Sequence, residues 1–157
     1  MGKNGKTFIL YKFRTMVVGA ERQQQRYKHL NEANGPAFKI RHDPRYTPFG
    51  KFLSHTGLDE LPQLVNILNG DMALFGPRPL PVDEANKLTR WQQERHCIKP
   101  GIISPWILDG YHKKQFDDWM KSDLAYVKNK SFVYDLKLFI RSIVFMVRLI
   151  MVELWCR

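Results

Sequence analysis

Two adjacent carboxylates, Asp59 and Glu60, stand in the segment HTGLDELPQL of a chain that is otherwise strongly basic. Acidic side chains near a helix start are stabilised by the helix dipole and by free N–H groups, so a purely structural role is one interpretation. Adjacent helical residues lie about 100° apart, which directs the two carboxylates differently and suits them to different tasks. One could act as a nucleophile toward phosphorus. The other could hold Mg²⁺, which proteins bind with one or two carboxylates plus substrate phosphates.

Three basic residues are candidates for binding those phosphates. Arg78 lies between two prolines in the motif GPRP, and a rigidly held guanidinium binds phosphate in a bidentate manner with little entropy loss. Lys12 and Arg14, in YKFRTM, have the i, i+2 spacing that places two side chains on one face of a strand. A surface turn and a solvated edge strand are the alternatives for these motifs. Combined with the carboxylates, they predict a site for phosphate chemistry.

The composition limits the class of protein. The chain has 157 residues, of which 44% are hydrophobic and 25% charged, as expected for one globular domain. With 25 Lys and Arg against 15 Asp and Glu, its net charge is +10. This predicts a polyanionic partner: nucleic acid, a phosphorylated small molecule or an anionic membrane surface. The sequence shows no recognised nucleic-acid reading motif and no interleaved aromatic and basic run, so no nucleic-acid partner is expected.

A helix is predicted over residues 58–69, which carry the carboxylates. Its apolar residues recur at i, i+3, i+4 and i+7, at Leu61, Leu64, Val65 and Leu68, while Asp59, Gln63 and Asn66 share the opposite face. Thr56 with Asp59 three residues later resembles a capping box. Pro62 fits the first turn, and Asn69-Gly70 supplies the stop.

The remaining elements complete an expected α+β fold, mostly helical and small, with a short β element near the N-terminus and amphipathic membrane-interface helices. Strand-like pieces are predicted at 6–18 and 36–40, helices at 19–35, 81–97, 115–129 and 131–155, and loops at 41–50, 71–81 and 99–115, the last with a turn at Asp109-Gly110.

The helix predicted at 131–155 raises the question of a membrane. Lys137, Arg141 and Arg148 share one helical face, and large apolar residues lie elsewhere around the helix. This pattern is typical of an interfacial helix, with a buried helix packed on the domain as the alternative. No segment reaches the roughly 20 uncharged residues of a spanning helix.

Four segments occur in an order and at spacings that resemble the bacterial sugar transferase family. They are GKNGKTFILYKFRTM, FKIRHDPRYTPFGKFL, GLDELPQLVNILNGDMALFGPRPLP and KPGI, and the resemblance covers roughly residues 2–148. Members are monotopic polyprenyl-phosphate phosphoglycosyl transferases that begin capsule, O-antigen and exopolysaccharide assembly. The resemblance implies a single catalytic domain over residues 1–157, peripheral or monotopic at the cytoplasmic face of a bacterial inner membrane.

The implied reaction is Mg²⁺-dependent transfer of a sugar-1-phosphate from a UDP-sugar to a polyprenyl phosphate such as undecaprenyl phosphate. In the family, the aspartate matching Asp59 attacks the phosphate attached to the sugar, UMP leaves, and the lipid phosphate then attacks the phospho-sugar enzyme. The glutamate matching Glu60 is associated with the metal, and Asp59 is its second expected ligand. The other positions that match substrate-binding motifs are Lys12 and Arg14 of KFR, Arg78 and Pro79 of GPRP, and Asp135 of the C-terminal DLK segment.

Three features depart from the family pattern. Members carry an N-terminal membrane helix ahead of the NGK…KFR segment, and here Met1 falls almost directly before it, which predicts a truncated member, a misassigned start or a fragment of a longer enzyme. Ser54 stands where the family has an arginine, with His55 and Lys51 as candidate replacements. The stretch ISPWILDGYHKK replaces residues expected to shape the sugar or lipid pocket. The alternative function is therefore a catalytically impaired remnant that binds a membrane surface. The sugar, the polyprenyl acceptor and the oligomeric state, a homodimer included, stay open.

Overall fold

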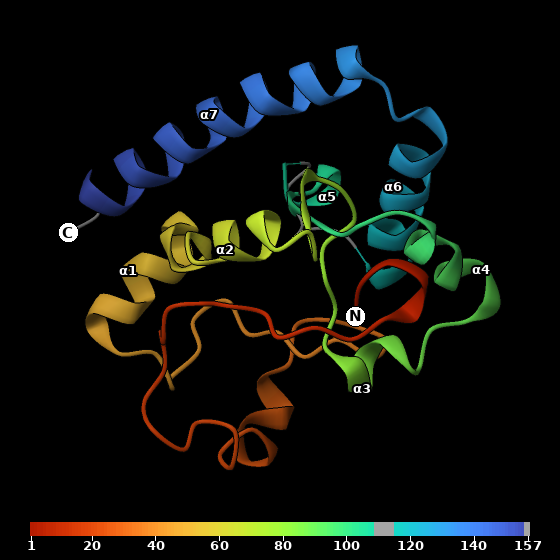
Figure 1. The fold of residues 1–157 in the computed structure, drawn as a ribbon. Coiled ribbons are helices and arrows are strands. Elements are labelled where there is room, and N and C mark those ends of the chain that lie inside the picture. Colours follow the sequence, from red (N-terminus) through yellow and green to blue (C-terminus); the bar gives the residue numbers. More distant parts are fainter. Residues whose placement is uncertain (109–114, 156–157) are drawn as a thin grey trace.

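The computed structural model describes residues 1–108 and 115–155. Figure 1 shows that the long helix α7 lies across one side of the molecule, while the extended N-terminal segment runs below α1 and α2. The helices and strands are α1 (Pro48–Thr56), α2 (Gln63–Leu68), β1 (Ala73–Phe75), α3 (Val82–Ala85), α4 (Arg90–Gln93), β2 (Gly101–Ile103), α5 (Pro105–Leu108), α6 (Phe116–Asn129) and α7 (Phe132–Trp155). Short 3-10 helices occur at η1 (Lys3–Gly5), η2 (Gln25–Leu30), η3 (Leu58–Glu60) and η4 (Glu94–Cys97). The prediction of a small, mostly helical α+β fold is confirmed.

A two-stranded parallel sheet forms the centre of the fold. β1 pairs with β2 in the register Ala73 to Gly101 and Phe75 to Ile103. The backbone approaches itself very closely where β2 begins, because a Cβ added to Gly101 would lie 2.2 Å from the backbone nitrogen of Gly76, the residue after β1. Position 101 therefore requires glycine, because any side chain there would collide with the neighbouring backbone. β1 lies inside the segment 71–81, which was predicted as a loop, and β2 inside the irregular segment 99–115.

The β structure is not where the sequence pattern placed it. Residues 6–18 are extended, but their pairing is a single antiparallel bridge between Met16 and Tyr46. The strand predicted at 36–40 does not form either. A strand needs a neighbouring strand to satisfy its backbone groups along its length. In this fold the side chain of Asn66 and the carbonyl of Asp59 take that role for residues 9–13.

The first three residues of α1, Pro48–Gly50, were predicted as the end of a loop because they include proline and glycine. Thr47 caps the helix by accepting a hydrogen bond from Gly50 N at 2.9 Å, and Pro48 occupies the first turn, where its missing N–H is no loss. Gly50 lets the N-terminal segment approach, since a Cβ there would lie 1.9 Å from Thr15 O. The helix ends at Gly57, whose φ of 76° is left-handed.

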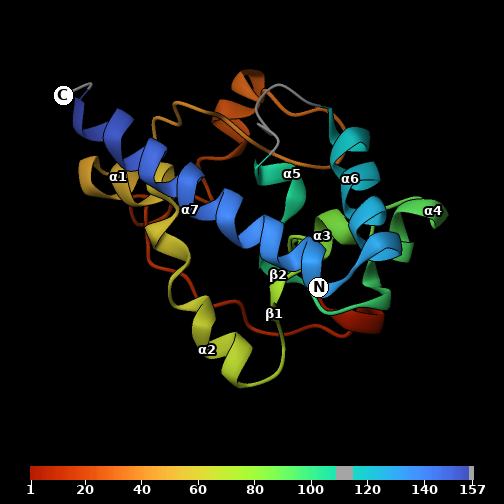
Figure 2. The same ribbon diagram turned by 90° about the horizontal axis from the view of Figure 1, so that it is seen from above.

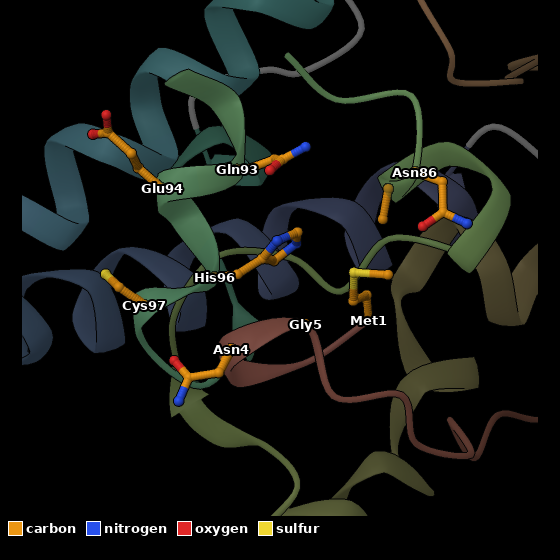
Figure 3. Close-up of a pocket in the computed structure, with 9 residues that line it drawn as sticks. Met1, Asn4, Gly5, Asn86, Gln93, Glu94, His96 and Cys97 are labelled. Carbon is orange, nitrogen blue, oxygen red and sulfur yellow. The ribbon is translucent and has the colours of Figure 1, made fainter. Parts of the chain in front are cut away.

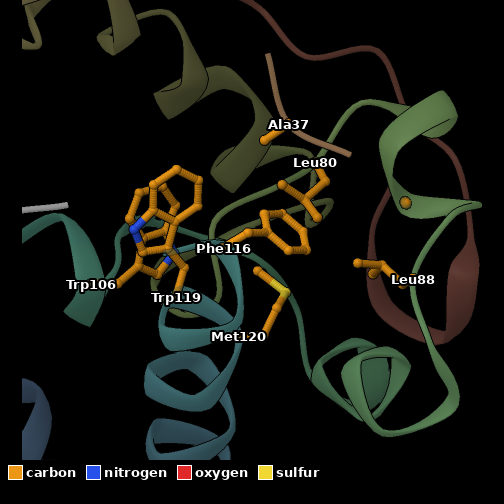
Figure 4. Packing of buried hydrophobic residues seen from close by; sticks show 8 residues of the cluster. Ala37, Leu80, Leu88, Trp106, Phe116, Trp119 and Met120 are labelled. Carbon is orange, nitrogen blue, oxygen red and sulfur yellow. The ribbon is translucent and has the colours of Figure 1, made fainter. Parts of the chain in front are cut away.

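The hydrophobic core lies between α6, α5 and the segment around α3. It is formed by Ala37, Leu80, Ala85, Leu88, Trp106, Phe116, Trp119 and Met120, as Figure 4 shows. Trp106 and Trp119 stack with ring centroids 4.9 Å apart. The amphipathic helix predicted at 115–129 is confirmed, because α6 buries one face against this core.

Three predicted helices are broken into shorter pieces, and the one predicted at residues 58–69 is divided into η3 and α2. Residues 81–97 form α3, α4 and η4, because Thr89 starts a new helix with a capping box to Gln92. Residues 19–35 form turns and the short helix η2.

Helix α7 confirms the helix predicted at 131–155. It packs on α1, α5 and β2, and Figure 2 shows it crossing above β2. Leu138 is buried, whereas most of the other large apolar side chains of the helix are exposed, up to 90% at Trp155. No helix in the described ranges has the length and apolar character that crossing a bilayer requires.

Candidate active site

Asp59 and Glu60 lie at the junction between α1 and α2. The left-handed Gly57 follows the end of α1, the 3-10 helix η3 carries the two carboxylates, and Pro62 is the N-cap residue of α2. The predicted capping box does not form. Thr56 belongs to the last turn of α1, and its hydroxyl donates to Phe52 O at 2.7 Å. The tight junction, and not a helix start, therefore positions the carboxylates.

Helix α2 buries its polar face and exposes its apolar face. Asp59, Gln63 and Asn66 are at most 2% exposed. The apolar residues at helical spacing are exposed by about half or more: Leu61, Leu64, Val65 and Leu68. The helical period was predicted correctly, but the polar side faces the protein. A buried polar face needs partners, and the site supplies them.

The site is a network of two carboxylates and two cations from three separate segments. The Lys12 ammonium lies 2.8 Å from Asp59 Oδ2 and 3.5 Å from Glu60 Oε1. Arg78 pairs with both oxygens of Glu60, with 3.0 Å between Nη1 and Oε2. The two carboxylates were expected to point in different directions, yet both reach Lys12. The four charges sum to zero within the network.

Arg78 is held in position both by a hydrogen bond to its backbone carbonyl and by the ion pair of its side chain with Glu60. It follows β1 through Gly76 and Pro77, and its carbonyl accepts a hydrogen bond from Arg95. Arg95 also pairs with Asp123 of α6 at 2.6 Å, and both of these side chains are at most 2% exposed. Burial raises the pKa of Asp123 to about 6, although Arg95 acts in the opposite direction. The buried pair therefore anchors the GPRP turn to α6.

The network sets the charge state of both carboxylates. Burial raises the pKa of Glu60, but Arg78 and Lys12 more than offset burial and lower it to about 2. Burial also raises the pKa of Asp59, which Lys12 and Arg78 oppose. Glu60 is therefore a firmly ionised partner of Arg78. The Lys12 and Arg78 charges favour the ionised form of Asp59 against the effect of burial on its pKa.

Lys39 is a further basic residue at the site that sequence reasoning did not select. Burial and the positive charge of Arg78 lower its pKa to about 7, and the charges of Glu60 and Lys12 also act on it. Its ammonium lies 5.9 Å from the ring centroid of Trp119. The signal was present in the sequence, because Lys39 stands in the FKIRHDP segment of the family resemblance.

The other predicted residues lie outside this network. Arg14 is exposed, and Pro79 is half-buried beside Arg78. Asp135 accepts a hydrogen bond from the Tyr126 hydroxyl at 2.7 Å and so joins α7 to α6. Substrate binding by these three residues stays a prediction. Ser54, at the position of the family arginine, forms a 2.9 Å hydrogen bond with Tyr46.

The carboxylates have suitable chemistry for Mg²⁺. Asp59 Oδ2 is a buried, hard oxygen donor whose neighbour is the Lys12 ammonium at 2.8 Å. Within the described residues, no group of three or more acidic, His or Cys side chains forms a complete metal cage. The pair fits a site in which substrate phosphates supply the remaining ligands.

A pocket of about 460 Å³ lies apart from the charge network. Figure 3 shows its lining where η1 meets η4, including Met1, Asn4, His96 and Cys97. Burial and the charge of Arg95 lower the pKa of His96 to about 4, so the imidazole is neutral at pH 7. None of the lining residues belongs to the carboxylate pair or its cations.

The stretch ISPWILDGYHKK, which departs from the family pattern, and the turn predicted at Asp109-Gly110 fall partly or wholly on residues 109–114, which lie outside the described residues.

Comparison with known protein sequences identifies the same family that the motifs at the site resemble. A profile of the bacterial sugar transferase family matches residues 1–149. The galactosyl transferase CpsE of Streptococcus agalactiae is 40% identical over 144 residues, 91% of this chain and 32% of that protein. The undecaprenyl-phosphate galactose phosphotransferase of Salmonella typhimurium is 37% identical, over 90% of this chain and 31% of its own length. The UDP-glucose:undecaprenyl-phosphate glucose-1-phosphate transferase of Escherichia coli is 33% identical, over 87% and 29%.

The chain spans about a third of the length of these three relatives. The profile nevertheless takes in nearly the whole chain, including every residue of the charge network. The chain therefore belongs to the bacterial sugar transferase family.

Proposed function

We propose that the chain transfers a sugar-1-phosphate from a UDP-sugar to polyprenyl phosphate, as the first membrane step of bacterial polysaccharide synthesis. The observation that carries this proposal is the buried Asp59 held against Lys12, next to the Glu60–Arg78 pair. The relatives' names support the substrate class, since they include undecaprenyl-phosphate sugar phosphotransferases. An anionic nucleophile amid cations is the arrangement that attack on a phosphate requires.

The chemistry proceeds in two displacements at one phosphorus. An Asp59 carboxylate oxygen forms a bond to the phosphorus that carries the sugar, and the bond to UMP breaks with its electron pair on UMP. An oxygen of the polyprenyl phosphate then bonds to that phosphorus, and the bond to Asp59 breaks. Both nucleophiles are already anionic, so neither step needs a strong base. Asp59 must be ionised, and Lys12 favours that state.

The cations are proposed to change partners when substrate binds. Lys12 and Arg78 now neutralise the carboxylates, and incoming phosphates compete for the same two cations. The carboxylate oxygens that are released are then available to Mg²⁺, which Asp59 and Glu60 would hold together with the phosphates. When bound, Mg²⁺ would neutralise the charge that develops on the phosphates. Lys39 adds a third cation close to Arg78.

A membrane surface is the proposed location, since the polyprenyl acceptor is a lipid. α7 exposes apolar side chains along its length beside the exposed cations Lys137, Arg141 and Arg148. The exposed apolar face of α2 adds a second patch next to the carboxylates. A helix with an apolar face and basic flanks binds the interface of anionic bilayers. We propose that this surface is the cytoplasmic face of the bacterial inner membrane, as the family resemblance implies.

The test is UMP release from a panel of UDP-sugars, with Mg²⁺ and undecaprenyl phosphate in detergent. We expect release that needs both metal and lipid in the wild-type chain and that stops in Asp59→Asn. Asp83→Asn, on the exposed surface of α3, is the matched control and should keep wild-type turnover. Turnover retained by Asp59→Asn would refute the nucleophile. A folded wild-type chain that releases no UMP would favour the catalytically impaired membrane-binding remnant.

A further inference from the structure

The side chain of Asn66 holds the extended N-terminal segment to α2. Its amide nitrogen donates to Ile9 O at 2.7 Å, and its amide oxygen accepts from Tyr11 N at 3.0 Å. Asn66 itself is 0% exposed. One carboxamide thus satisfies a carbonyl and an N–H two residues apart, as a neighbouring strand would.

Apolar burial does not hold this segment in place. Ile9 is 74% exposed, and Tyr11 and Phe13 are also exposed. The backbone of the segment is anchored again on the other side of Lys12, where Phe13 N donates to Asp59 O at 2.9 Å. Lys12 therefore lies between two backbone anchors, and the first of them is the side chain of Asn66.

The side chain at position 66 must both donate and accept. Aspartate would keep an acceptor for Tyr11 N but lose the donor to Ile9 O, and alanine would lose both. A buried backbone group left without a partner is destabilising, so the segment would shift to regain water or another partner. Such a shift would move the Lys12 ammonium away from Asp59.

We infer that Asn66 is a positioning residue for Lys12, because its carboxamide fixes residues 9–11 so that the Lys12 ammonium lies against Asp59 and Glu60. The effect on turnover rests on the proposed transferase function, whereas the effect on the backbone does not.

A double-mutant cycle separates positioning from general support of the fold. Asn66→Ala should lower kcat/KM by roughly tenfold or more in the wild-type background, but by less than about twofold in Lys12→Ala, where no ammonium remains to be positioned. Asn69→Ala, on the exposed end of the same helix region, is the control and should leave kcat/KM unchanged in both backgrounds. Equal losses from Asn66→Ala in both backgrounds would overturn the inference.

Hydrogen exchange tests the clamp without relying on activity. The Tyr11 amide should exchange roughly tenfold faster in Asn66→Ala while amides of α6 keep their protection. If Asn66→Ala fails to fold, Asn66→Asp replaces it: the residue has the same size but no donor for Ile9 O, and the Lys12 cycle is repeated with it. Unchanged Tyr11 exchange in a folded variant would refute the clamp. Loss of Tyr11 protection in a chain whose wild type releases no UMP would support the clamp and contradict the proposed function.

Discussion

The substitution Glu60→Gln tests whether the charge network contributes to stability as the structure indicates. Glutamine has nearly the size of glutamate and resembles its protonated form, so the change removes the charge and little else. The Glu60 side chain is 12% exposed and pairs with Arg78 and Lys12. Its pKa is lowered from 4.5 to about 2, because these cations outweigh the effect of burial.

The sign of the pH dependence follows from that lowered pKa. Ionised Glu60 stabilises the folded state above the unfolded pKa of 4.5, and this contribution is lost as the pH falls toward 2. A pKa lowered from 4.5 to about 2 corresponds to roughly 3 kcal/mol at pH 7. By the same relation about 1.4 kcal/mol remains at pH 3. Glu60→Gln should therefore lower the free energy of unfolding strongly at pH 7 and much less at pH 3.

Urea unfolding followed by tryptophan fluorescence at pH 7, 5 and 3 measures this difference. The matched control is Glu21→Gln, whose exposed side chain lies outside the network and should change the free energy of unfolding by less than about 0.5 kcal/mol at each pH. A Glu60→Gln difference that is equal at pH 7 and pH 3 would show that the ion pairs are not its source. A negligible difference at pH 7 would show that the network is not formed in solution.

Three further predictions concern the cations, the N-terminal segment and the membrane. In the wild type we expect UMP to bind more weakly as the pH rises from 6 to 8, because Lys39, with a pKa of about 7, loses its positive charge over that range. Lys39→Met should abolish this pH dependence, and calorimetric titration of UMP at several pH values measures it. Gly50→Ala should lower the free energy of unfolding by about 1–3 kcal/mol, since the new Cβ would meet Thr15 O at 1.9 Å; urea unfolding would contradict this if the stability were unchanged. Ile140→Glu with Val144→Glu, two exposed positions on α7, should reduce binding to anionic liposomes at least tenfold in a flotation assay, and unchanged binding would exclude this part of α7 as the contact.

Much of the site was predictable from sequence, because it rests on short motifs. Asp59 and Glu60 are adjacent in the chain, so their proximity needed no tertiary structure. Arg78 was marked by its flanking prolines and Lys12 by its place in the resemblance. The structure brings these four together. What no spacing indicated was that both carboxylates share Lys12, since the chain is folded back over about 47 residues to place it there.

Elements defined by periodicity were also predictable, within limits. The helices predicted at residues 115–129 and 131–155 form, because a long amphipathic segment shows both the helical period and the length of the helix in its sequence. The strand predicted at residues 6–18 was wrong, because apolar runs interrupted by charged residues also occur in an extended chain that pairs with no strand. Whether such a chain becomes a strand depends on a partner strand that local sequence does not specify.

The sequence by itself determined the identities and order of the reactive groups and the helical period around them. Only the tertiary structure decided which face of that period is buried. In α2 the leucine-rich face is exposed and Asn66 is buried, because the N-terminal segment offers unpaired backbone groups that a carboxamide satisfies. Lys39 lies near Arg78, Glu60 and Lys12 only because the fold brings together segments that are far apart in the chain. Periodicity shows that a helix has two faces, but only its neighbours determine which face packs inside.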